Sequence, residues 1–392
     1  MTAPGIDPGA VKANGMGTTA PASPATVPAA GRHPLLTPPA RRFARGWLVL
    51  AVAVALLPLA LRSGYQFTVL NVVAVNLIVV TGLNLLMGYA GQISYGHAAF
   101  FGMGAYGSAI LSTTHGVDPW LAMGVSACGV AVAAAAVGVP TLRLKGNYLV
   151  MATLGFNLIV DVILVQWSDV TGGSSGFVGV PPLAVAGLSF DTDRSFYWLV
   201  WGVALLLLIP ARNLVHSPVG RALRAIHDSE PGAEACGVPT ASYKVQVFVL
   251  SAVFASLAGS LHAHYLGIVA PKTFDIFKSV EFVTMCLIGG MGSLWGGLAG
   301  ALLLTVLPQM LGVFEEHHDL IFGAILLVML IFMPRGVSPW LRDMLKKGMG
   351  NGRRPGGPNA PHSPVSPVTP VTPVTPASSI RPVTPQDGEA RP

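Results

Sequence analysis

Solidly apolar segments alternate with short polar ones along most of this chain. Ten apolar runs recur, at residues 47–62, 67–88, 91–113, 119–140, 148–166, 196–210, 246–268, 279–295, 297–312 and 320–334. A helix needs about 20 apolar residues to cross the hydrocarbon core of a membrane, and runs without strict alternation are not barrel strands. The pattern therefore predicts an all-α fold, a polytopic transmembrane helix bundle of about ten spans. The runs at 47–62, 196–210 and 297–312 fall furthest short of the spanning length.

One long polar segment, residues 211–246, separates the sixth run from the seventh. Ser217 followed by Pro218 is a typical helix start, because a hydroxyl caps the first turn and proline fits its first position. Ser229 is a second N-cap, and Gly237, with a proline two residues later, is a typical helix end. The segment therefore predicts two short helices that meet at a bend. The small residues of the second are Ala233, Ala235 and Gly237.

Polar and apolar residues occupy opposite faces of the first of these two helices. The apolar face consists of Val219, Ala222, Leu223 and Ile226. The polar face carries Arg221, Arg224 and Asp228, and the four-residue spacing of the last two predicts an ion pair. Such a segment is suited either to dock on another protein or to lie on the membrane surface.

The charges of the loops orient the bundle, because cytoplasmic loops of membrane proteins are rich in lysine and arginine. Basic residues precede the first run, separate the fourth from the fifth and follow the last, whereas the opposite loops are mainly acidic. An even number of spans with both termini in the cytoplasm satisfies every loop. This topology places residues 211–246 in the cytoplasm.

The composition agrees with a membrane protein and argues against a nucleic-acid partner. The chain is 52% hydrophobic and 10% charged, whereas soluble domains carry about 25% charged residues. Of the 23 lysines and arginines, 19 fall on the predicted cytoplasmic side, so the net charge of +6 reflects membrane topology. Residues 1–46 are Ala/Pro-rich and residues 341–392 carry Val-Ser/Thr-Pro repeats, which predicts disordered cytoplasmic tails around a transmembrane domain at 47–340.

Two regions in opposite halves of the chain are rich in small residues, as an internal repeat would place them. Ser94, Ala98 and Gly102 recur at four-residue spacing, and so do Gly292, Gly296 and Gly300. Small residues at this spacing let helices pack closely, while glycine also lets a helix break where a solute passes. The candidates for helix packing or a translocation pathway are therefore Gly91, Gln92, Ser94, Gly96, His97, Gly102, Gly292, Gly296 and Gly300.

Ionisable residues within membrane spans are costly, so each one is a functional candidate. Asp161, His262, His264 and Glu281 lie toward the predicted outer ends of their spans, where they could ring an outer vestibule. For His97 the alternative to a pathway role is a hydrogen bond to a neighbouring backbone carbonyl. The run Glu315-Glu316-His317-His318-Asp319 is interpreted as a solvated outer turn, and no metal site is expected.

Six stretches of this sequence resemble the permease subunit of branched-chain amino-acid ABC importers, of the LivM-like kind. They are GLNLLMGYAGQISYGHAAFFG at 82–102, LRLKGNYL at 142–149, TGG at 171–173, GRALRAI at 220–226, AHYLG at 263–267 and GGMGSLWG at 289–296. Together they cover about residues 65–340 in the family's order.

The resemblance implies a transport subunit, not an enzyme, in the cytoplasmic (inner or plasma) membrane of a bacterium. It implies that residues 230–237 dock on the ATPase, with Arg221, Arg224, Glu230, Glu234 and Gly237 as the coupling residues. The implied partners are a second permease, two ABC ATPase subunits, an extracytoplasmic solute-binding protein and the lipid membrane, with no nucleic acid. This chain would bind no cofactor, and its partner subunits would use ATP.

Two departures from the family's pattern bear on the solute and on coupling. Asn157-Leu158 stands where the family tends to have a Gly-Glu pair, and Pro231 stands where an aliphatic residue is usual. Branched-chain amino acids are therefore the first candidate solute, with other amino acids, urea and short amides as alternatives. No Gly-Lys-Ser/Thr occurs, so the chain has no phosphate-binding loop of its own. The alternative function is a proton-coupled secondary transporter of small amino acids or amides, with Asp161 and the histidines as its relay.

Overall fold

The computed structural model describes residues 39–60, 63–142, 144, 146–185, 187–311 and 323. Its elements are α1 (Pro39–Ala60), α2 (Gly64–Asn84), the π-helix η2 (Leu85–Tyr89), α3 (His97–Thr114), α4 (Pro119–Thr141), α5 (Asn147–Gln166), α6 (Ser168–Thr171), the 3₁₀ helix η3 (Gly173–Ser175), β1 (Phe177–Val178), β2 (Ala184–Val185), β3 (Leu188–Ser189), α7 (Asp193–His216), α8 (Pro218–Asp228), α9 (Glu230–Ala235), α10 (Thr240–Leu266), β4 (Ile268–Val269), the 3₁₀ helix η4 (Pro271–Phe274), α11 (Ile276–Gly289) and α12 (Leu294–Leu311).

The prediction of a polytopic helical membrane protein is confirmed at this level. Within the described ranges, five helical segments are long and apolar enough to cross a membrane: Gly64–Tyr89, Pro119–Thr141, Asn147–Gln166, Asp193–His216 and Thr240–Leu266. Gly46–Pro58 and Leu294–Gln309 are shorter apolar helices. The count of ten spans and the cytoplasmic position of both termini stay predictions. The run at 320–334 and the acidic turn at 315–319 lie outside the described residues, apart from residue 323, as does the tail at 341–392.

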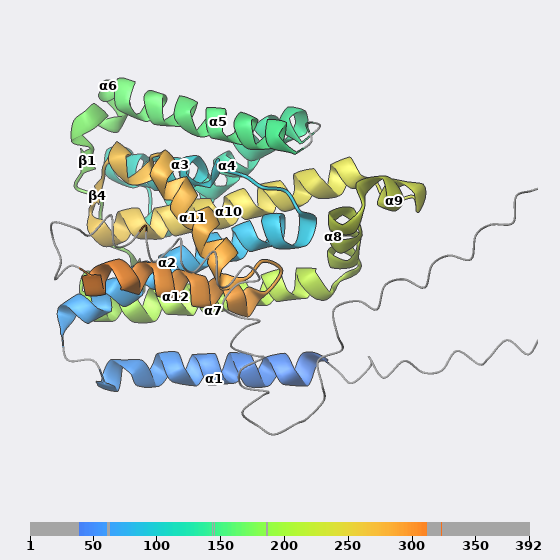
Figure 1. Ribbon diagram of the computed structural model, residues 1–392. Helices are drawn as coiled ribbons and strands as arrows, with labels where there is room; N and C mark the ends of the chain where they lie inside the picture. The colour runs from blue at the N-terminus through green and yellow to red at the C-terminus, as the bar shows by residue number, and fades with distance from the viewer. Residues whose placement is uncertain are drawn as a thin grey trace, which may run out of the picture.

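The long helices lie side by side, so that their connections gather at two ends of the bundle (Figure 1). α10 is the central helix and packs against α2, α3 and α4. At one end, α8 and α9 project beyond the other helices, on the right in Figure 1. At the opposite end lie α6 and the antiparallel strands β1 and β4, in which Phe177 pairs with Val269.

Glycine allows the close contact between α3 and α10 in the core. A Cβ added at Gly104 would lie 2.3 Å from the carbonyl oxygen of Ser256, and one added at Gly259 would lie 1.9 Å from that of Phe101. Close backbone approach of this kind supplies the packing between helices in a membrane, where the hydrophobic effect does not. Gly102 packs on the Phe274 side chain, with a Cβ distance of 3.0 Å, so its role is helix packing.

Three boundaries differ from the predicted runs. α1 begins at Pro39, so residues 39–46 belong to a helix and not to the predicted tail. The third run forms a helix only from His97, because Gly91 adopts φ +67° and residues 91–96 are not helical. α11 has 14 residues, which gives about 21 Å at 1.5 Å per residue, less than the roughly 30 Å of a bilayer core. It forms a hairpin with α12 through the turn at 290–293.

Candidate functional site

The two short helices predicted in the polar segment form as expected, and we call residues 217–237 the α8–α9 protrusion. The Ser217 hydroxyl accepts a hydrogen bond from the Gly220 amide at 3.3 Å, and the Ser229 hydroxyl accepts one from the Gly232 amide at 3.2 Å. Gly237 follows α9 with φ +79°, a left-handed conformation that favours glycine. Local capping therefore fixes where both helices begin and where the second one ends.

The predicted faces of α8 are confirmed, but its predicted ion pair does not form. Leu223 and Ile226 are buried, while Arg221, Arg224 and Asp228 are exposed. The Arg224 guanidinium donates from Nη1 to the Val215 carbonyl oxygen at 3.2 Å instead of pairing with Asp228. This contact satisfies a carbonyl in the last turn of α7, where a cation is favoured by the helix dipole.

Both glutamates of α9, predicted as coupling residues, are bonded within the protrusion and its neighbouring helix. Lys244 Nζ lies 2.5 Å from Glu230 Oε1, and the Lys244 side chain is only 3% exposed. The Thr240 hydroxyl donates to Glu234 Oε1 at 2.8 Å. Because Thr240 and Lys244 belong to the first turns of α10, the two glutamates hold α9 against the start of that helix.

The tip of the protrusion that remains available is small and carries few charges. Pro231, Gly232, Ala235 and Cys236 are exposed, as is Gly237, whereas the third residue of the predicted small face, Ala233, is buried. Pro231 occupies the first turn of α9, where a missing amide proton leaves no hydrogen bond unmade. The family departure at this position is therefore compatible with the helix.

The protrusion rests on the first glycine-rich segment. A Cβ added at Gly91 would lie 2.7 Å from Nδ1 of His227 on α8. Gln92 is half-buried beside it, with its Nε2 donating to the Ala90 carbonyl oxygen at 3.2 Å. Gly91 thus lies at the α8–α9 end of the bundle, against the protrusion, with Gln92 next to it in the chain.

The two glycine-rich segments meet at Asn84, at the end of α2. Its side-chain Nδ2 donates to the Ser293 carbonyl oxygen at 2.7 Å, and its Oδ1 accepts from the Gly292 amide at 2.8 Å. A Cβ added at Gly88 in η2 would lie 2.2 Å from the Gly292 nitrogen. The contacts therefore run from α8 through Gly91 and η2 to the α11–α12 turn.

The remaining small residues of the second glycine-rich segment pack α11 against α12. A Cβ added at Gly296 would lie 2.5 Å from the Gly289 carbonyl oxygen, and one added at Gly300 would lie 1.9 Å from that of Met285. Gly292, predicted to share their helical face, lies in the turn before α12 with φ +74°. The prediction of a single face is therefore wrong for Gly292, and close packing accounts for the other two.

Ser94 and Gly96 belong to the break before α3, so the predicted face of Ser94, Ala98 and Gly102 is also wrong. The Ser94 hydroxyl accepts from the Gly96 amide at 3.3 Å, and the neighbouring Tyr95 amide donates to Thr153 Oγ1 at 3.1 Å. Gly96 itself faces α5, because a Cβ added there would lie 3.2 Å from the Thr153 carbonyl oxygen. A helix break is thus realised here, packed against α5.

His97 and His264 are buried side chains that connect helices. His97 Nε2 lies 2.5 Å from the Ser251 hydroxyl of α10, a side-chain partner in place of the predicted backbone carbonyl. His264, a predicted vestibule residue, has Nε2 at 2.7 Å from the Ser108 hydroxyl and Nδ1 at 2.7 Å from the Pro181 carbonyl oxygen. Because His264 joins α3 to the loop that contains Pro181, a packing role is the better interpretation.

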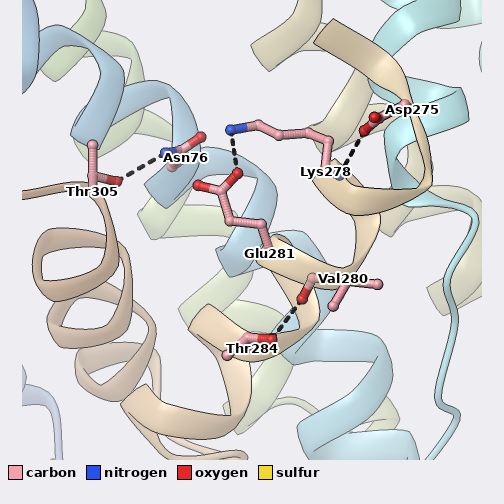
Figure 2. A network of polar contacts seen from close by, with 7 residues as sticks. All are labelled: Asn76, Asp275, Lys278, Val280, Glu281, Thr284 and Thr305. Atoms are coloured by element: carbon pink, nitrogen blue, oxygen red, sulfur yellow. Dashed lines mark hydrogen bonds and ion pairs between the residues drawn. The ribbon is translucent and has the colours of Figure 1, made fainter. Parts of the chain in front are cut away.

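A cavity of about 810 Å³ opens at the end of the bundle opposite the protrusion, and we call it the outer cavity. It is lined by residues of α2, α3, α10, η4, α11 and α12, including Asn76, His262, Asp275, Lys278, Glu281 and Thr305. Figure 2 shows Lys278 and Glu281 on α11, with Asn76 and Thr305 across from them. Of the four predicted vestibule residues, His262 and Glu281 line this cavity, and His264 and Asp161 are not among its lining residues.

Sequence reasoning missed two polar residues that the structure brings forward, Lys278 and Asn84, and did not predict the burial of a third, Asn157. Lys278 forms the outer cavity with Glu281, Asn84 joins the two glycine-rich segments, and Asn157 is a buried amide on α5. Within the described part of the chain, neither side-chain polar atom of Asn157 has a hydrogen-bond partner. The sequence signal that could have found these residues is a polar side chain inside an apolar run, because such a residue is a candidate for a functional role.

Comparison with known proteins identifies the family. The model of a family described as branched-chain amino acid transport system / permease component matches residues 65–330. This chain belongs to that family. The resemblance seen in the sequence is thereby confirmed, and the chain is a permease subunit with the transmembrane helices that this role requires.

Individual relatives agree with this assignment. The high-affinity branched-chain amino acid transport system permease protein LivM of Escherichia coli K12 is 31% identical over 322 residues, which cover 76% of this chain and 75% of LivM. LivH of the same strain is 25% identical over 284 residues, covering 66% of this chain and 90% of LivH. The probable LivM of Methanocaldococcus jannaschii is 22% identical over 311 residues, covering 67% and 90%. No solved structure matches this permease subunit.

Proposed function

We propose that this permease subunit takes up an amino acid at its outer cavity. We propose also that conformational changes of an ATP-hydrolysing partner are coupled to it through the α8–α9 protrusion. The protrusion would lie in the cytoplasm and dock on a separate ABC ATPase. Solute would enter from the opposite end, where an extracytoplasmic binding protein would deliver it. Branched-chain amino acids are the first candidate solute, because the names of LivM and LivH describe their transport.

The observation that carries the proposal is how the protrusion is braced. Glu230 and Glu234 are bonded to α10, and α8 buries Leu223 and Ile226 against the bundle. A segment held in this way moves as one body with the helices behind it. The contacts of Gly91 with His227 provide a route for that movement into η2. A surface helix that merely lay on lipid would need no such internal bonds.

The proposed assembly contains a second permease, two ATPases and a binding protein, in the cytoplasmic membrane of a bacterium. Two kinds of permease protein, LivM and LivH, are both related to this chain, which favours a heterodimer of permeases. Arg221 is exposed on α8 and is suited to meet acidic residues of the ATPase. The uncharged tip residues would enter its groove.

The test uses the exposed thiol of Cys236 at the tip. In a variant with Cys128→Ser and Cys286→Ser, Cys236 is the remaining cysteine of the chain. A membrane-impermeant maleimide should label it in inside-out vesicles and not in right-side-out vesicles. Co-expressed ATPase subunits should co-purify with the permease and protect Cys236 from the reagent.

A matched control keeps Cys128 instead, which is exposed on α4 within a candidate span. Because a membrane-impermeant reagent does not reach a thiol that faces lipid, Cys128 should stay unlabelled from either side, with and without the ATPases. Labelling of Cys236 from the outside would contradict the proposed orientation. Equal labelling of Cys236 in the free and ATPase-bound complexes would contradict docking at the tip.

A further inference from the structure

The outer cavity has the size and composition of a site for a small solute. Its volume of about 810 Å³ lies within the range of ligand pockets, which is about 300–1,000 Å³. Val72, Phe101 and Leu304 provide apolar wall, and the Asn76–Thr305 hydrogen bond of 2.9 Å joins α2 to α12 on the same wall. Such a mixture suits a solute with an apolar part and a polar part.

The charges that line the outer cavity are balanced. Lys272 and Lys278 are the basic residues, and Asp275 and Glu281 are the acidic ones. A balanced site disfavours a solute with a net charge, which would meet an unpaired repulsive group. It favours a solute that carries one charge of each sign.

Two of these charges, Lys278 and Glu281, form an ion pair in which a solute can replace either partner. Lys278 Nζ donates to Glu281 Oε2 at 2.9 Å, and the two side chains are 21% and 33% exposed. In Figure 2 the Lys278 side chain reaches from α11 toward Asn76, and the Glu281 carboxylate lies below its ammonium group. Ion pairs open to water contribute little to stability, so a solute can replace one at little cost.

Neighbouring groups position the Lys278 ammonium and the start of α11. The Lys278 ammonium lies 5.1 Å from the centre of the Phe282 ring, within the range of a cation–π contact. The Asp275 carboxylate caps α11 by accepting a hydrogen bond from the Lys278 amide at 3.1 Å. The pair is thus presented from the first turns of a capped helix, and not from a loop.

We propose that the outer cavity is a subsite for a zwitterionic α-amino acid, with Lys278 as the partner of its carboxylate and Glu281 as the partner of its ammonium group. The proposal rests on the importer function proposed above. Both charged groups of an α-amino acid are attached to one carbon, so a cation and an anion three residues apart on α11 are placed to hold both. The solute's side chain would lie on the wall of Val72, Phe101 and Leu304. Lys278 and Glu281 would then determine specificity.

The test is transport of radiolabelled L-leucine into proteoliposomes that contain the whole importer, with its binding protein at saturation. Lys278→Met and Glu281→Gln should each lower the transport rate by about ten- to a hundredfold, the usual effect of losing one charge-assisted hydrogen bond. ATP hydrolysis stimulated by the binding protein should persist in both variants. The matched control is Arg194→Met, which removes an exposed positive charge at the start of α7 that does not line the cavity and should transport within about twofold of the wild type.

A charge exchange separates a solute subsite from a structural ion pair. The double variant Lys278→Glu/Glu281→Lys keeps a pair on α11 but reverses its direction. A structural pair would be restored by this exchange, and transport would return to the wild-type rate. A subsite would not be restored, because the reversed solute would turn its side chain away from the apolar wall.

The possible failures are distinguishable. If the wild-type complex neither binds its ATPases nor transports leucine, the proposed importer function is wrong. If the wild type transports leucine and the Lys278→Met and Glu281→Gln variants transport it equally well, only the subsite is wrong. Restoration of transport by the charge exchange would also overturn the subsite.

Discussion

Two lysine–glutamate pairs of the same chemistry lie at opposite ends of this permease, in different surroundings. Lys244 is 3% exposed and pairs with Glu230 beneath the protrusion, whereas Lys278 and Glu281 are 21% and 33% exposed in the outer cavity. Removing one partner of a buried pair leaves an uncompensated charge, while an exposed pair is screened by water. Burial therefore makes one pair a brace of the fold and leaves the other available to a solute.

The buried pair gives the largest expected effect on stability. Glu230→Ala leaves the Lys244 ammonium buried without a counter-charge, which should lower the free energy of unfolding by about 3 kcal/mol. Thermal unfolding of the detergent-solubilised protein measures this loss, and ATPase co-purification should fall with it. Glu234→Ala is the control, because it removes a single bond to the neutral Thr240 and should cost about 1 kcal/mol.

A double variant shows whether the charge itself is the cause. Lys244→Met added to Glu230→Ala removes the unpaired ammonium and should recover a large part of the lost stability. If the unfolding temperature of the Glu230→Ala variant is not lower than that of the wild type, the pair does not brace the fold. The contrast between the two ends would then have no energetic basis.

The contact between Gly88 of η2 and Gly292 of the α11–α12 turn, which we call the joint, gives the second-largest expected effect on stability. Gly88→Ala places a methyl group against the Gly292 nitrogen, where the added Cβ would lie at 2.2 Å. Such overpacking should cost about 1–3 kcal/mol and separate η2 from the α11–α12 turn. ATPase subunits should still bind the protrusion, while leucine transported per ATP hydrolysed should fall.

The control for this joint is a helical glycine with space around it. A Cβ added at Gly124 on α4 meets nothing within 4 Å. Gly124→Ala should therefore leave transport unchanged and raise stability by about 0.5–1 kcal/mol, since alanine orders a helix at lower entropic cost than glycine. Equal transport by the Gly88→Ala and Gly124→Ala variants would contradict a role for the joint in coupling.

The sequence predicted what local chemistry controls. Ser217, Ser229 and Gly237 were identified as caps because capping involves residues within one helical turn. The buried face of α8 followed from the 3.6-residue period. The family motifs also placed the protrusion between the sixth and seventh apolar runs, which form α7 and α10.

Long-range contacts could not be predicted in this way. Asn84 bonds to a turn more than 200 residues further along the chain, and nothing near it in the sequence indicates that partner. The sequence left open whether the chain breaks before α3, because Gly91 fits either a packed helix or a left-handed turn. The sequence indicates how far along its span His264 lies, which predicted a vestibule residue. It does not indicate where the side chain points, because that depends on Ser108 of α3 and on the Pro181 carbonyl oxygen.

The third prediction concerns Asn157, an unbonded amide in the described core and the position where this chain departs from the family's Gly-Glu pair. Asn157→Leu removes two buried polar atoms without partners, so it should raise the free energy of unfolding by about 1–2 kcal/mol. The control is Asn76→Leu, which breaks the bond to Thr305 and should lower it by about 1 kcal/mol. Thermal unfolding distinguishes the two signs, and a loss of stability in Asn157→Leu would mean that the amide has a structural partner.

The smallest expected effect on stability belongs to the exposed pair, and it completes the comparison. Lys278→Met leaves Glu281 a third exposed, where water solvates the carboxylate, so the free energy of unfolding should change by less than about 1 kcal/mol. Unfolding of this variant and of Glu230→Ala, measured under the same conditions, compares the two ends directly. A change in Lys278→Met as large as that in Glu230→Ala would make the second pair a brace as well. A protein that keeps its stability but loses leucine transport would instead show that the charges in the outer cavity serve the solute.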